Sequence, residues 1–106
     1  MTFRNKYRSK LRIIADILEA VNGGSKKTRI MFRANLSYKL LCKYLDEILK
    51  ASLVKAGPSS SNRYFLTEKG ELFLRRFRKY SMQKEEIKEK FSSIANEKET
   101  LEKMLE

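Results

Sequence analysis

A heptad repeat in the C-terminal third constrains the fold of this 106-residue chain more than any other feature. From residue 73 onward, apolar and aromatic residues recur in alternating steps of four and three, which is the pattern of a coiled-coil seam. No proline interrupts residues 67–106, so we expect one helix of about 40 residues and about 60 Å. The rest of the chain is too small to cover it, and its far half therefore needs a partner. The seam positions are Phe73, Phe77, Tyr80, Lys84, Ile87, Phe91, Ile94, Lys98, Leu101 and Leu105.

Two lysines in the seam indicate how a second copy would pack. In a parallel dimer, Lys84 and Lys98 would each face its own copy and stack like charges. An antiparallel register centred between Ile87 and Phe91 instead places each lysine against an apolar or aromatic residue, past which its stem can reach solvent. We therefore expect an antiparallel coiled-coil homodimer, with the seam residues from Phe77 onward as its dimerisation residues. A helix that folds back on its own domain is the alternative, and the first two seam residues could serve that domain's core.

Residues 9–51 follow a pattern of three short helices. Apolar spacing predicts helices at about 9–22, 26–34 and 37–51. Ser9 and Ser37 stand at helix starts, where a hydroxyl can accept a hydrogen bond from a free backbone N–H. An Asn-Gly-Gly-Ser segment at 22–25 ends the first helix. Asn35 tolerates the left-handed backbone of a tight turn, so the second and third helices are predicted to form a helix-turn-helix.

Two short strands are predicted at 53–56 and 63–66, joined by the polar segment Gly-Pro-Ser-Ser-Ser-Asn at 57–62. They would form a small two-stranded wing. The predicted fold is therefore mainly α: a winged helix-turn-helix domain with a long C-terminal helix. The predicted division is a basic N-terminal arm at 1–8, a DNA-binding domain at 9–80 and a coiled-coil dimerisation helix at 81–106.

Positive charge is concentrated before residue 67. The net charge is +11, and residues 1–66 hold 14 basic against 4 acidic residues. So strong an excess predicts a polyanionic partner. A helix-turn-helix that binds DNA inserts the N-terminal part of its second helix into the major groove. The candidate DNA-binding residues are Lys26, Lys27, Arg29, Arg33, Ser37, Tyr38, Lys39, Lys43 and Arg63.

A second basic cluster lies at the start of the chain, and the predicted recognition helix lacks arginine. The cluster comprises Arg4, Lys6, Arg8, Lys10 and Arg12. Lysines contact phosphates without reading sequence, whereas arginine makes the commonest specific contact to guanine. We therefore expect weak sequence preference.

Several classes of function are disfavoured by the composition. The chain has one cysteine, Cys42, and no histidine, so we expect no disulfide, no metal site and no Cys–His or Ser–His pair. We accordingly expect no enzyme activity, no cofactor and no small-molecule substrate. No apolar run is long enough to span a membrane, and residues 1–10 lack the apolar core of a signal peptide. The expected location is the cytoplasm, in association with the nucleoid.

Three sequence blocks carry a family resemblance: KTRIMFRANLSYKLL at 27–41, YLDEILKASLV at 44–54 and RYFLTEKGELFL at 63–74. They resemble the archaeal 10a-type winged-helix DNA-binding proteins. The resemblance implies homodimers that pair through an antiparallel coiled coil and bind double-stranded DNA with little specificity. It further implies chromatin or nucleoid organisation by bending, coating or bridging DNA. Carried over, Ser37, Tyr38, Lys39 and Lys43 would face the groove, and Arg63 would belong to the wing.

Two departures and two alternatives remain open. The basic arm is longer than in the family pattern, and the Gly-Pro-Ser wing is unusual. One alternative is a sequence-specific winged-helix transcription regulator. The other is a protein-interaction module that uses the winged helix and the coiled coil to bind proteins.

Overall fold

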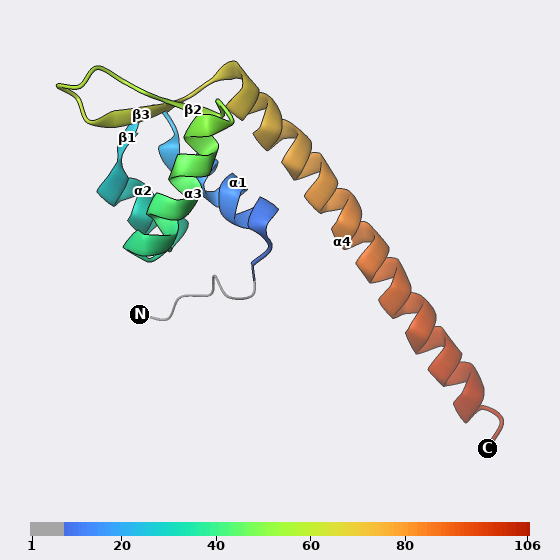
Figure 1. Cartoon of the computed structure of the whole chain (residues 1–106). Helices are drawn as coiled ribbons and strands as arrows, with labels where there is room; N and C mark the ends of the chain where they lie inside the picture. The colour runs from blue at the N-terminus through green and yellow to red at the C-terminus, as the bar shows by residue number, and fades with distance from the viewer. Residues whose placement is uncertain (1–7) are drawn as a thin grey trace.

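The computed structural model describes residues 8–106, and four helices and three strands follow one another along the chain (Figure 1). Of the predicted basic arm at 1–8, only Arg8 therefore lies within the described residues. The elements are α1 (Lys10–Val21), β1 (Ser25–Lys26), α2 (Lys27–Ala34), α3 (Tyr38–Lys50), β2 (Val54–Ala56), β3 (Arg63–Leu66) and α4 (Glu68–Lys103).

Hydroxyl caps fix where three of the helices begin. The Ser9 hydroxyl accepts from the Arg12 N–H (3.1 Å), and the Ser37 hydroxyl accepts from the Leu40 N–H (3.2 Å). Thr67 caps α4 in the same way, since its Oγ1 accepts from the Gly70 N–H at 3.0 Å. These caps satisfy backbone donors that have no partner inside the helix. The helix starts predicted at Ser9 and Ser37 are confirmed, and the last helix begins where the range 67–106 placed it.

The turn between α2 and α3 also has the predicted geometry. Asn35 lies in the left-handed region with φ of 54°, and the Leu36 N–H donates back to the Met31 carbonyl oxygen at 3.1 Å. Three residues therefore suffice to reverse the chain between the two helices, and the helix-turn-helix is confirmed.

The sheet has one strand more than the sequence predicted. Its order is β1-β3-β2, and both pairings are antiparallel. β2 and β3 form the predicted two-stranded wing, with Val54 opposite Leu66. β1 consists of two residues, with Ser25 opposite Tyr64. The predicted two-stranded wing is confirmed, and β1 is an additional strand that the sequence did not predict, because a two-residue strand has no periodicity.

Residues 8–80, which we call the head, enclose a single core around α1. Ile17, Leu18 and Val21 of α1 are inaccessible to solvent. α2 contributes Ile30, and α3 contributes its buried stripe of Leu41, Leu45 and Ile48. Because α1 contacts the other three helices and strands β1 and β3, it lies at the centre of the head and fixes the exposed faces of α2 and α3.

α4 leaves the head and continues alone (Figure 1). Leu74 is its last buried residue, and every residue from Met82 to the end is exposed. The radius of gyration is 19.0 Å, against about 13 Å for a compact chain of this size. The fold-back alternative is thus wrong. Phe73 and Phe77, at the start of the seam, pack against the core of the head. No helix of the described residues is long and apolar enough to cross a membrane.

Gly70 lets α4 approach the backbone of the segment before β2. A Cβ at this position would overlap the carbonyl oxygen of Leu53. That oxygen already accepts a hydrogen bond from the Thr67 N–H at 3.2 Å, so it cannot move away freely. The contact fixes the position of the first turn of α4 against the head.

We expect Gly70→Ala to lower the free energy of unfolding by roughly 1–3 kcal/mol, as overpacking does in a close-packed interior. Urea unfolding at one protein concentration measures the change. Gly23→Ala is the matched control, because a Cβ there meets nothing within 4 Å. Equal stabilities of the two variants would contradict this account of Gly70.

Candidate nucleic-acid interface

The N-terminal half of α3 presents a polar, positively charged surface. The buried stripe of Leu41, Leu45 and Ile48 points α3 toward the core and leaves Tyr38, Lys39 and Lys43 exposed on the other side. Tyr38 is 59% exposed although it is aromatic. Cys42 is half-buried between the lysines.

Lys27 of α2 joins this surface. Its Nζ lies 5.6 Å from the centre of the Tyr38 ring, a distance at which a cation is attracted to an aromatic face. We call Lys27, Ser37, Tyr38, Lys39 and Lys43 the α3 face. The first acidic residues of α3 are Asp46 and Glu47, one turn further along. The α3 face therefore carries cations at the start of the helix and acids only behind them.

The other four candidate cations lie elsewhere. Lys26, Arg29, Arg33 and Arg63 line an open hollow of about 870 Å³ between the α1–β1 turn, α2 and β3. We call it the cationic hollow. Arg63 Nη1 donates to the Gly24 carbonyl oxygen and Arg33 Nη1 donates to the Ala20 carbonyl oxygen, both at 3.3 Å. The nine candidates thus form two groups, the α3 face and the lining of the cationic hollow, which the sequence alone did not separate.

The wing borders the start of α2. A smaller hollow of about 450 Å³ lies between Lys26, Lys27 and Thr28 on one side and the polar 57–59 segment of the wing on the other. Arg63 lines both hollows. The structure therefore places Arg63 at the base of the wing, as predicted, and beside the helix-turn-helix.

The described members of the second basic cluster are engaged within the protein. Lys10 forms an ion pair with Glu47, whose hydrogen bond and negative charge raise the pKa of Lys10 above its usual value. The Arg12 guanidinium lies 5.5 Å from the centre of the Phe77 ring. Arg8 makes three polar contacts inside the head. Phosphate binding by this cluster stays a prediction, and Arg4 and Lys6 lie outside the described residues.

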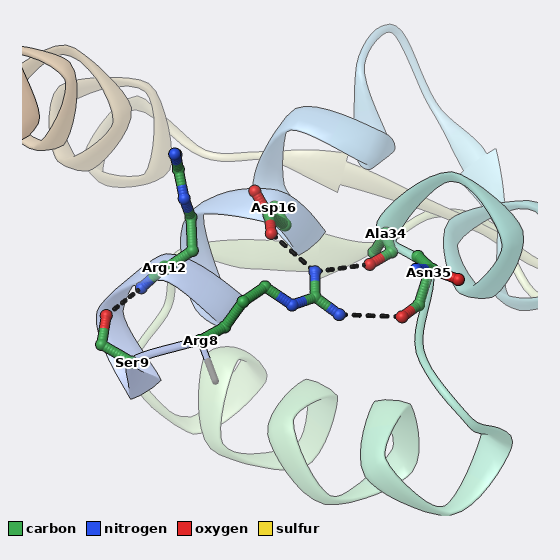
Figure 2. Close-up of polar contacts among 6 residues, drawn as sticks. All are labelled: Arg8, Ser9, Arg12, Asp16, Ala34 and Asn35. Atoms are coloured by element: carbon green, nitrogen blue, oxygen red, sulfur yellow. Dashed lines mark hydrogen bonds and ion pairs between the residues drawn. The ribbon is translucent and has the colours of Figure 1, made fainter. Parts of the chain in front are cut away.

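Arg8 ties the start of the chain to the helix-turn-helix (Figure 2). Its Nη1 donates to Asp16 Oδ2 at 2.7 Å and to the Ala34 carbonyl oxygen at 2.8 Å, and Nη2 donates to the Asn35 carbonyl oxygen at 2.8 Å. These carbonyls end α2, where backbone acceptors lack helical partners. Arg8 therefore positions the turn that precedes α3. Its charge alone gave no sign of this role.

The predicted dimerisation residues are exposed along α4 once the helix has left the head. Phe91 is 70% exposed, and Leu105, in the turn that follows α4, is 88% exposed. Phe77 differs, since its ring packs against the head and lies 6.1 Å from the Tyr80 ring, centre to centre. Lys84 Nζ lies 5.6 Å from the centre of the Tyr80 ring. The other exposed seam residues are Tyr80, Ile87, Ile94 and Leu101, together with the predicted seam lysines Lys84 and Lys98.

Comparison with known proteins agrees with this geometry. A family model described as winged helix-turn-helix matches residues 7–85, which is most of the chain. This chain belongs to the winged helix-turn-helix family. The match covers all three head helices, the wing and the first half of α4.

Two curated relatives are uncharacterized proteins of Methanocaldococcus jannaschii. MJ0290 is 41% identical over 68 residues, which cover 63% of this chain and 31% of the relative. MJ0287 is 33% identical over 69 residues, which cover 64% of this chain and 68% of the relative. The winged helix-turn-helix chain thus spans about a third of the first relative and two thirds of the second.

One solved structure has the same fold over nearly its whole length. Sso10a-2, a DNA-binding protein from Sulfolobus solfataricus, superposes with a TM-score of 0.77 at 24% identity, and the alignment covers 84% of this chain and 95% of that one. The resemblance to the archaeal 10a-type winged-helix proteins is therefore confirmed for the fold.

We expect Arg8→Lys to lower the free energy of unfolding of this winged helix by roughly 1–3 kcal/mol, because lysine keeps the charge but cannot make the forked contact. Urea denaturation tests this. Arg29→Lys serves as the control, since Arg29 is exposed and lies outside the network. A loss no larger than that of the control would mean that Arg8 does not stabilise the turn.

Proposed function

We propose that this protein is a homodimer that binds double-stranded DNA with little sequence specificity and organises it in the nucleoid. The observation that carries the proposal is the α3 face, in which an exposed helix start bears Lys39 and Lys43 with Lys27 beside them. The protein would bend, coat or bridge DNA in the cytoplasm. The function requires no catalytic group, metal or cofactor.

The charge order along α3 favours entry into the groove by the start of the helix. Lysines come first, and Asp46 and Glu47 follow where they would repel phosphates less. Both acids also have internal partners: Asp46 pairs with Lys50 at 3.0 Å, and Glu47 pairs with Lys10. Ser37 would lie at the edge of the groove, and Arg63 would reach the backbone from the base of the wing.

Low specificity follows from the side chains available. A bidentate arginine–guanine contact is the commonest specific contact in a major groove, and α3 has no arginine. Lysine neutralises phosphate as a point charge. The α3 face would therefore bind most sequences with similar affinity, which suits an abundant architectural protein better than a regulator with one operator.

Dimerisation is proposed through residues 81–106, with DNA binding assigned to residues 9–80. The exposed apolar seam beyond Tyr80 would pair with a second copy in the antiparallel register, which keeps Lys84 and Lys98 apart. Two heads at opposite ends of a coil of about 40–60 Å could then hold two duplexes. The description of Sso10a-2 as a DNA-binding protein supports the proposal.

We expect two unrelated 30-base-pair duplexes to bind with equal affinity and with a steep negative dependence on salt. Each phosphate neutralised contributes about −0.9 to the slope of log K against log salt. Replacing Lys39 and Lys43 by glutamine should make the slope shallower by about 1.8 per head. Fluorescence anisotropy at several salt concentrations measures both quantities. A variant with Lys88 and Lys90 replaced by glutamine controls for net charge, because both lie on the distal half of α4.

Other results of the same titration would redirect the proposal. A large difference in affinity between the two duplexes would point to a sequence-specific regulator. No binding at low salt would overturn the DNA proposal and favour the protein-interaction module.

We expect Ile87→Asn with Ile94→Asn to convert the dimer to a monomer, since both substitutions place an amide in the proposed apolar seam. Sedimentation equilibrium reports the change. The control is Ser92→Asn with Ser93→Asn, which lies on the same helix outside the seam. The proposed dimer through α4 would be refuted by a double seam variant that sediments as the unaltered protein does. The monomer should still bind DNA, more weakly and without bridging.

A further inference from the structure

An exposed aromatic ring stands in the cationic hollow, away from the α3 face. Phe32 of α2 is 65% exposed, more than Tyr38, and it lines the hollow together with Lys26, Arg29, Arg33 and Arg63. Its helix buries Ile30 and Ala34 on the opposite side. The core of the head therefore does not use this ring, and the proposed duplex contact does not use it either.

The electrostatics of the hollow suit an anion with several phosphates. Among residues 8–106, four cations and no acidic residue line it. Two of these cations are held in place: Arg33 by the Ala20 carbonyl oxygen and Arg63 by the Gly24 carbonyl oxygen. A guanidinium has five N–H donors, so each arginine keeps donors for a ligand after this one contact.

The start of α2 adds further donors at the rim. Lys26 is the N-cap, and its side chain makes no capping hydrogen bond. The first turn of α2 contains no acidic residue. Its free backbone N–H groups therefore add to the positive potential at Lys26 and Thr28, which line the hollow.

The combination of Phe32 and the cations distinguishes between nucleic acids. A duplex offers phosphates, but its base faces are stacked on one another and unavailable to a side chain lying against the surface. An unpaired strand offers both phosphates and free base faces. Base–aromatic stacking on a positively charged groove is the usual way in which proteins hold single strands without reading their sequence.

We propose that the cationic hollow binds an unpaired stretch of single-stranded nucleic acid. A base stacks on Phe32, Arg29 and Arg33 contact the phosphate on the α1 side, and Lys26 and Arg63 contact the next phosphate along the strand. This site shares no residue with the α3 face. A protein that holds both surfaces in one head would bind at junctions where a duplex opens into single strands.

The test compares a 12-nucleotide thymidine strand with an abasic strand of equal length, using the full chain and fluorescence anisotropy. The unaltered protein should bind the thymidine strand more tightly. Phe32→Leu should remove that preference and weaken thymidine binding about ten-fold, with the duplex affinity and the thermal melting curve unchanged. Tyr38→Leu is the matched control, because Tyr38 is the exposed aromatic residue of the α3 face. A uridine strand is titrated in parallel. Whichever of the thymidine and uridine strands binds more tightly assigns the ligand to DNA or to RNA.

The cations give a second, independent readout. Replacing Arg29 and Arg33 by glutamine should weaken the binding of the thymidine strand and of the abasic strand by the same factor. It should also make the slope of log K against log salt for single strands shallower by about 1.4. Replacing Lys39 and Lys43 should instead weaken the duplex more than the single strand. Equal binding of the thymidine and abasic strands would overturn the proposal, as would a preference that survives Phe32→Leu or is lost in Tyr38→Leu. The duplex titration tests duplex binding by the α3 face independently of these single-strand measurements.

Discussion

Burial of α1 is the constraint on which the other elements depend. Ile17, Leu18 and Val21 contribute on the order of 1.5–3 kcal/mol each when fully buried, and every other helix contacts α1. By contrast, the ion pair between Arg78 and Glu19 is about half exposed on both sides, and such pairs contribute about 0–1 kcal/mol. The attachment of α4 to the head therefore comes from buried Leu74, from Phe73 and Phe77 against the core, and from the close approach at Gly70. The head could not orient α2, α3 or α4 without α1 at its centre.

Most of the fold was predictable because its signals are local. Hydroxyl caps at Ser9, Ser37 and Thr67, the asparagine turn and the periodic apolar stripes each act within a few residues, and the structure has all of them. β1 was not predictable in this way. Its residues, Ser25 and Lys26, pair with β3 nearly forty positions later in the chain, so the pairing depends on how the wing folds back.

The candidate interface was predictable in composition but not in arrangement. Its cations could be named from the charge excess, whereas their division into two groups depends on how α2, α3 and β3 pack against one another. Arg8 and Phe32 were missed for the same reason. Arg8 finds its acceptors at Asp16 and at the end of α2, and Phe32 remains exposed because Ile30 and Ala34 take the buried positions. The spacing of residues in the sequence gives their angular positions around a helix, but the packing of neighbouring elements decides which of those positions face solvent.

No break separates the part of α4 that packs on the head from its exposed part, so α4 fixes the orientation of the head about the helix axis. α4 continues as one helix from its attachment at Gly70 and Leu74 to Lys103, near the end of the exposed region. A helix advances about 1.5 Å and turns about 100° per residue. The number of residues before the seam therefore sets the direction in which the head points around the axis of α4. Inserting a single residue after Ser81 would rotate the head by about a quarter turn relative to whatever the seam holds. The number of residues in α4 therefore sets the direction of the α3 face as well as its distance from the seam.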